Sequence, residues 1–95
     1  MESPSLAALE ASIVALNASA ALASADLLDA EPLARTAAEA FRNLAAAYTA
    51  AGNLDGSAKA QANAEGFESL AADLAASPRI AAARRIRDAL ASQPR

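Results

Sequence analysis

The sequence predicts an all-α fold, a compact four-helix antiparallel bundle built from αα-hairpins. Hydrophobic residues make up 55% of the chain while aromatic residues make up only 3%, and alanine and leucine dominate. Ala and Leu have high helix propensity, whereas strands favour β-branched and aromatic residues. Caps, glycine and proline interrupt the chain at three points, and the connections are short. We therefore expect consecutive helices to be antiparallel neighbours in a single domain covering residues 1–95.

Each interruption coincides with residues that begin or end helices. The breaks are expected at Asp29–Pro32, Gly52–Asp55 and Ser77–Pro78. Gly52 can adopt the left-handed conformation that ends a helix, and Asn53 or Asp55 can cap the next one. Ser3 and Pro4 form a cap-plus-proline start at the other end of the chain. The expected helices cover residues of about 4–28, 32–51, 55–76 and 78–92.

The first expected helix is apolar on all sides. One stripe at helical spacing consists of Leu6, Leu9, Ile13, Leu16, Ala20 and Leu27. The opposite side is also uncharged and carries Ala11, Val14, Ala18, Leu22 and Ala25. A helix that is apolar all round is normally buried on both sides. We therefore expect this helix to be the centre of the bundle or half of a self-association surface.

The last expected helix is basic in an otherwise acidic chain of net charge −3. From Ser77 onward Asp88 is the single acid, among Arg79, Arg84, Arg85, Arg87 and Arg95. These arginines are expected to pair with acidic helices of the same chain; the alternative is contact with an acidic partner. The apolar side is expected to bury Ile80, Ala83, Ile86 and Leu90.

Residues 38–64 resemble a tetratricopeptide repeat, a helix–turn–helix unit. The matching positions are Phe41, Leu44, Ala45, Tyr48, Gly52, Leu54 and Ala64. Three positions depart from the family pattern: Ser57 replaces a small alanine, Gln61 replaces an aromatic residue, and Ser69 stands where a proline closes the repeat. The resemblance implies a helical hairpin of the protein-binding kind. The alternative is that an alanine-rich hairpin of any origin approximates this pattern.

Composition excludes several kinds of chemistry and gives no sign of a cofactor. With no His and no Cys, the chain cannot build a Ser-His-Asp triad, a histidine haem ligand or a thiolate zinc site. It also lacks a glycine-rich phosphate loop. An acidic chain without aromatics among its arginines does not favour nucleic-acid binding. No basic stretch precedes an apolar one, and the uncharged run Ala11–Ala25 is short for a bilayer, so we expect a soluble, cytoplasmic protein without membrane contact.

One lysine suggests an alternative, catalytic hypothesis. If Phe67, Leu70 and Leu74 mark the core face of their helix, Lys59 and Asn63 fall on its inward half. Burial disfavours the charged ammonium form, and a neutral amine can form a Schiff base with a small carbonyl ligand in retro-aldol chemistry. Tyr48 and Asn63 would then assist Lys59. The alternative is that Lys59 extends past the apolar edge to water.

The leading functional hypothesis is a non-catalytic helical scaffold that binds a protein partner or a second copy of itself. A Schiff-base catalyst centred on Lys59 is the alternative. The absence of His, Cys and Trp and the regular helix starts also fit a designed bundle. The small number of surface Lys and Glu residues fits a design less well.

Overall fold

A computed structural model describes residues 6–93 of the chain. The described part contains four α-helices and a 3₁₀ turn: α1 (Leu6–Ala23), η1 (Leu27–Asp29), α2 (Ala30–Ala50), α3 (Leu54–Ala76) and α4 (Pro78–Ala91). No strand occurs between residues 6 and 93, so the predicted all-α fold is confirmed. The predicted helix start at Ser3–Pro4 lies outside the described residues.

The second and third breaks lie where they were predicted. Gly52 has a φ of 80°, the left-handed conformation that glycine adopts without a steric penalty. Asn53 then caps α3, because its side chain accepts a hydrogen bond from the Gly56 N–H at 2.9 Å. At the last break the Ser77 hydroxyl accepts one from the Ile80 N–H at 3.3 Å.

The first break was predicted too late in the chain. α1 ends at Ala23, and α2 begins at Ala30. At the end of α1 the Ser24 hydroxyl donates to the Ala20 carbonyl at 3.0 Å. Pro32 lies inside the first turn of α2, where its missing N–H has no partner to lose. The proline therefore marks an early position within a helix, and the break precedes it.

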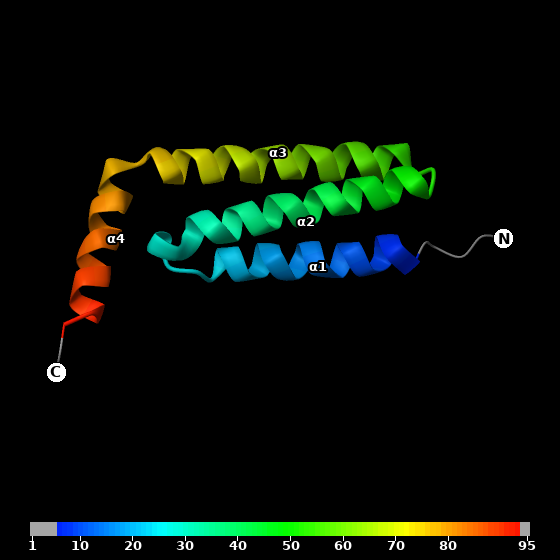
Figure 1. The fold of residues 1–95 in the computed structure, drawn as a ribbon. Helices are drawn as coiled ribbons and strands as arrows, with labels where there is room; N and C mark the ends of the chain where they lie inside the picture. Colours follow the sequence, from blue (N-terminus) through cyan, green and yellow to red (C-terminus); the bar gives the residue numbers. More distant parts are fainter. Residues whose placement is uncertain (1–5, 94–95) are drawn as a thin grey trace.

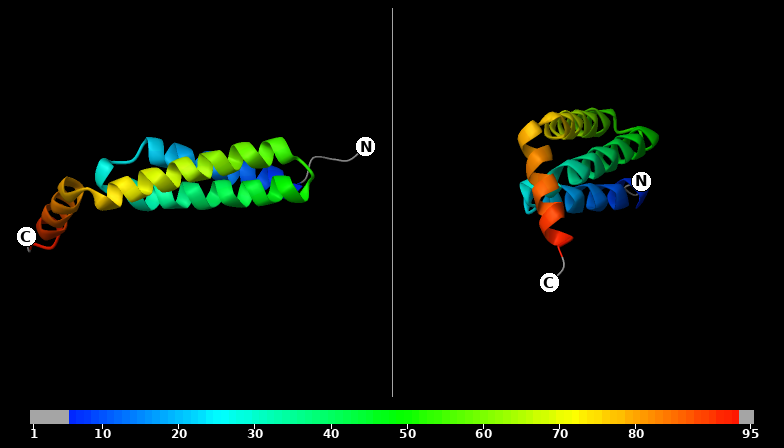
Figure 2. Two further views of the ribbon diagram at one scale, coloured as in Figure 1. Left: turned by 90° about the horizontal axis from the view of Figure 1, so that it is seen from above. Right: turned by 60° about the vertical axis from the view of Figure 1, so that its left-hand side comes forward.

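Three antiparallel helices form a layer, with α2 between α1 and α3 (Figure 1). α4 crosses one end of this layer instead of lying alongside it (Figures 1 and 2). The chain turns at Ser77, whose extended backbone (φ −77°, ψ 115°) separates two helices without a longer loop. The result is an elongated molecule measuring 63 × 27 × 16 Å, so the bundle is flatter than the sequence predicted.

Alanine makes up most of the buried core. Between residues 6 and 93, eleven of the fourteen buried hydrophobic residues are alanine, and the other three are Leu44, Leu74 and Ile80. The principal cluster joins the three helices of the layer through Ala15, Ala40, Leu44, Ala45 and Ala60. Phe41 and Phe67 stack beside it with their ring centroids 5.5 Å apart. Small residues permit close helix packing, but each one removes little apolar surface from water.

Gly66→Ala is expected to stabilise the fold by about 0.5–1 kcal/mol. Gly66 lies within α3, and an added Cβ would meet nothing within 4 Å. No other part of the described chain therefore packs closely enough on Gly66 to require a glycine there. Thermal melts should show a higher Tm. The comparison variant is Gly56→Ala, whose Cβ would lie 2.8 Å from the capping side chain of Asn53 and should not stabilise. An unchanged Tm for Gly66→Ala would contradict this expectation.

Candidate interaction surface

The large apolar side chains of α1 face outward. We define the outer stripe as Leu6, Leu9, Ile13, Leu16 and Ala20. Its four large residues are between 52% and 67% exposed, whereas Ala8 and Ala15 are buried on the opposite side of the helix. α1 packs only on α2 within the described chain, because it forms one edge of the layer. The expectation that the bundle buries both sides of this helix is therefore wrong for a single copy.

The outer stripe has the geometry of a helix-packing seam. Its members are separated alternately by three and four residues, which is the a/d spacing of a coiled coil. At about 100° per residue, the centre of the stripe lies about 140° around the helix from the buried Ala15. Val14 is 56% exposed but lies about 120° away from that centre. The stripe therefore forms a narrow apolar ridge directed away from the rest of the molecule.

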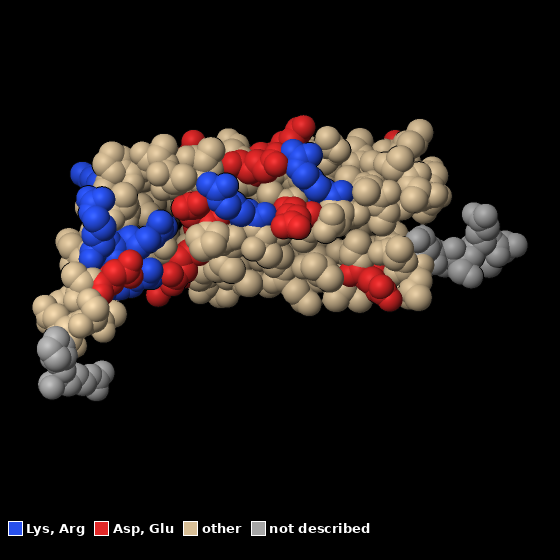
Figure 3. All heavy atoms as spheres, viewed as in Figure 1, with Lys and Arg blue, Asp and Glu red and all other residues tan. Residues whose placement is uncertain are grey.

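Charge is nearly absent from α1. Glu10 is the single charged residue between Leu6 and Ala23. On the face drawn in Figure 3, the charged side chains gather over the other helices and the surface of α1 is mostly uncharged. By length and composition alone α1 could also cross a membrane, with a mean hydropathy of 1.6 over 18 residues. Core helices of soluble proteins and signal sequences share that property. The hydropathy of α1 therefore does not distinguish a membrane helix from either of these.

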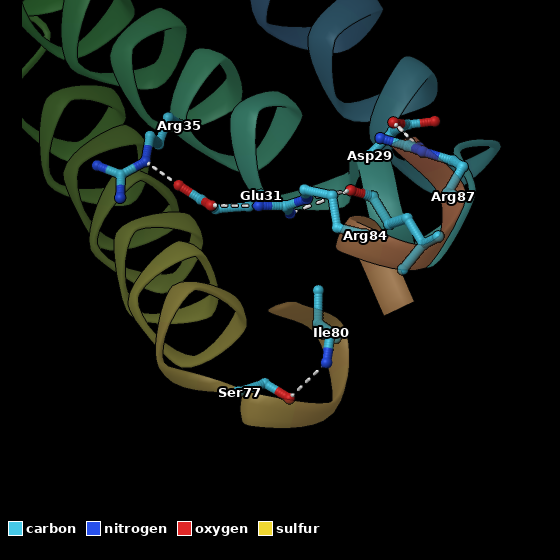
Figure 4. A network of polar contacts seen from close by, with 8 residues as sticks. Asp29, Glu31, Arg35, Ser77, Ile80, Arg84 and Arg87 are labelled. Atoms are coloured by element: carbon cyan, nitrogen blue, oxygen red, sulfur yellow. Dashed lines mark hydrogen bonds and ion pairs between the residues drawn. The ribbon is translucent and has the colours of Figure 1, made fainter. Parts of the chain in front are cut away.

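Arginines of α4 pair with acids of the same chain, as predicted (Figure 4). Arg87 Nη1 lies 2.7 Å from Asp29 Oδ1, and Arg84 Nη1 lies 3.6 Å from Glu31 Oε1. Arg84 also donates to the carbonyl of Leu28 at 3.1 Å. These polar contacts attach α4 to η1 and to the first turn of α2. The apolar contact between α4 and the rest of the chain is smaller than predicted.

Of the residues predicted to form the buried side of α4, only Ile80 is buried, in a cluster with Ala30 and Leu74. Ala83 is half-buried, and Ile86 and Leu90 are each 63% exposed. The reason is the crossing of α4 over the end of the layer. Only its first turns reach the other helices, so the remaining apolar residues have no helix alongside them.

Glu31 is expected to make stability depend on pH. Its hydrogen bond from Arg35, at 2.8 Å, and the charges of Arg35 and Arg84 hold the pKa of Glu31 below its ordinary value of 4.5. A lowered pKa in the folded state stabilises the fold above the ordinary pKa, and this contribution disappears as the pH falls through the lower value. Lowering the pH from 6 to 3 should therefore reduce the free energy of unfolding of wild type more than that of Glu31→Gln. Urea unfolding at each pH measures this difference. Equal losses would contradict this assignment.

The structure does not gather the predicted catalytic residues in a cavity. Lys59 and Asn63 are both exposed, while Tyr48 is half-buried against the core cluster. Tyr48 also lies beside Gly56, whose added Cβ would be 3.0 Å from the ring. The expectation that Lys59 faces a pocket is therefore corrected, because the side chain of Lys59 is exposed.

The phase of α3 explains the error. Its buried residues are Ala60, Ala64, Ala71 and Leu74, with Phe67 half-buried among them. Leu70, which was predicted to lie on the core face, is 40% exposed. The true centre of the face lies close to Ala60, and Lys59 lies about 100° away from it. Alanines make up most of the face that packs on α2, together with Phe67, which stacks on Phe41, and Leu74.

A shallow groove of about 380 Å³ does lie between α2 and α3, away from Lys59. Its lining consists of Arg35, Ala38, Glu39, Arg42, Glu68, Ala71 and Ala72. Arg35 pairs with Glu31, and Arg42 donates two hydrogen bonds to Glu68. The two arginines are thus paired within the chain, and the groove offers no unpaired arginine to a ligand. Among the described residues, no group of three or more acidic side chains is arranged to hold a metal ion.

The repeat-like hairpin corresponds to α2 and α3. Leu44 and Ala45 are buried in the core cluster, with Phe41 and Tyr48 packed against it. α3 continues to Ala76, beyond the position where a tetratricopeptide repeat would close. Comparisons with models of protein families, with curated proteins and with solved structures gave no match.

Proposed function

We propose that this protein is a non-catalytic helical interaction module whose binding surface is the outer stripe of α1. The observation that carries the proposal is the exposure of four large aliphatic side chains on one ridge: Leu6, Leu9, Ile13 and Leu16, at 67, 55, 52 and 63%. Scattered apolar residues are common on protein surfaces, but a contiguous apolar patch marks an interaction site. Here α2 and α3 act as the scaffold that presents the ridge.

The partner that fits this surface is an amphipathic helix. A ridge with a/d spacing packs by placing its side chains between those of a facing helix. Full burial of an aliphatic side chain contributes about 1.5–3 kcal/mol, so the exposed fractions of the four large residues represent about 4–7 kcal/mol. That contribution is large enough to offset part of the entropic cost of association. The exposed positions of Lys59 and Asn63 favour this hypothesis over a Schiff-base catalyst.

The test uses a synthetic helical peptide with leucine at a and d positions and lysine elsewhere. Fluorescence anisotropy of the labelled peptide should increase on titration with the full chain. Ile13→Glu should weaken binding at least about 10-fold, because a charge would enter the apolar seam.

The matched control is Val14→Glu. This variant adds the same charge at a neighbouring position of similar exposure, outside the outer stripe. It should bind the peptide as wild type does. Absence of binding, or equal loss in the two variants, would reject the outer stripe as the binding surface.

A further inference from the structure

We infer that the helix received by the outer stripe is α1 of a second copy, so that two chains form an antiparallel, two-fold symmetric dimer. This inference rests on the proposed function, because it names the partner of the same surface. A two-fold interface uses the same patch on both copies, and the patch must therefore complement itself. Two properties of the outer stripe satisfy this requirement.

The first property is a gradient of side-chain size along α1. Ala23, three residues after Ala20, continues the a/d spacing of the outer stripe to the end of α1. The seam is therefore bulky at its N-terminal end, with Leu6 and Leu9, and small at its C-terminal end, with Ala20 and Ala23. An antiparallel pairing places Leu6 against the partner's Ala23, and Leu9 against the partner's Ala20. Ile13 and Leu16 then meet at the centre. Large residues facing small ones fill a helix interface evenly, whereas a parallel pairing would leave alanine against alanine at one end.

The second property is the absence of repulsion between copies. Glu10 is the single charge on α1, so the residues flanking the seam carry no pattern that demands an oppositely charged partner. In the antiparallel register the two Glu10 residues lie about 13 Å apart along the helix axis. That separation exceeds the Debye length of about 8 Å at physiological ionic strength. Antiparallel helices also align their dipoles favourably.

A membrane surface is a poorer match for the same ridge. Helices that lie in a lipid interface carry lysine and arginine on their polar side. α1 has neither, and its opposite side is occupied by α2. Insertion across a bilayer would require α1 to leave α2 and expose the buried Ala15.

Sedimentation equilibrium of the full chain tests the dimer. The mass should rise with concentration toward twice the 9.5 kDa of the monomer. Ile13→Glu should raise the dimer dissociation constant at least about 100-fold, because both copies place a charge in the seam. Val14→Glu should dimerise like wild type. Circular dichroism should show that both variants stay helical, since both positions are exposed.

Cysteine pairing tests the orientation, because the chain contains no native cysteine. Leu9→Cys and Ala20→Cys proteins, mixed and oxidised, should form the mixed disulfide in preference to either symmetric one. Two Leu9 positions would lie about 16 Å apart along an antiparallel pair, beyond the reach of a disulfide. A dominant symmetric Leu9→Cys disulfide would reject the antiparallel arrangement.

The outcomes separate this inference from the proposed function. A chain that stays monomeric at millimolar concentration overturns the dimer, and so does a dimer that tolerates Ile13→Glu. If the monomer still binds the leucine peptide through the outer stripe, the proposed function stands without the dimer. Binding of the monomer to phosphatidylcholine vesicles, lost in Ile13→Glu, would assign the ridge to lipid and overturn the dimer.

Discussion

Ala64→Glu is expected to unfold the protein or to destabilise it by about 3–5 kcal/mol. Ala64 is completely buried on the side of α3 that packs against α2. A glutamate there would bring a charge without a partner into an interface that has space only for a methyl group. Proteins of this size have total stabilities of about 5–15 kcal/mol, so the loss would be a large fraction of the whole.

Urea unfolding followed by circular dichroism measures this loss. The matched control is Ala62→Glu, which adds the same charge to an exposed position of the same helix. Its stability should stay within about 0.5 kcal/mol of wild type. Similar stabilities for the two variants would mean that α3 does not pack on α2 through its alanines.

Leu44→Ala is expected to destabilise the fold by about 2–5 kcal/mol. Leu44 is 6% exposed and is one of three large side chains in a core made mostly of alanine. It belongs to the cluster that includes Ala15 of α1 and Ala60 of α3. Its removal would therefore leave a cavity in the cluster through which α2 joins the other two helices of the layer.

Leu54→Ala is the control for this experiment, because Leu54 is 70% exposed at the start of α3. It should change the free energy of unfolding by less than about 0.5 kcal/mol. Chemical denaturation of both variants decides the comparison. A loss of less than about 1 kcal/mol in Leu44→Ala would show that the alanine contacts hold the layer without it.

Local signals in the sequence predicted most of the helix boundaries correctly. Gly52 ends α2 through its own backbone conformation, and Asn53 caps α3 through a hydrogen bond to a residue three positions later. The same is true of Ser77 and Pro78. The boundary before α2 was misplaced because a proline such as Pro32 is compatible with two places, in the break before a helix or within the first turn of that helix. The local sequence does not choose between them.

The direction of each helix face was harder to predict. For α3 the large residues suggested one face, whereas the alanines that contact α2 define another. In an alanine-rich chain, size and burial are poorly correlated, because small residues allow the closest approach of two helices. Lys59 was assigned to the inside for this reason and lies outside. The apolar stripe of α1, in contrast, was recognised correctly as a stripe, but the sequence left open whether the bundle or a second copy covers it.

The amino-acid sequence by itself determined the all-α class, the turn after α2, the start of α4 and the nearly uncharged character of α1. Each of these depends on propensity, capping or composition, which act over a few neighbouring residues. The tertiary structure decided that α2 is the middle helix, that α4 crosses the end of the layer, and that the outer stripe is exposed. These features depend on which helices reach one another in space. A stripe of leucine and isoleucine has the same sequence whether another helix covers it or solvent does.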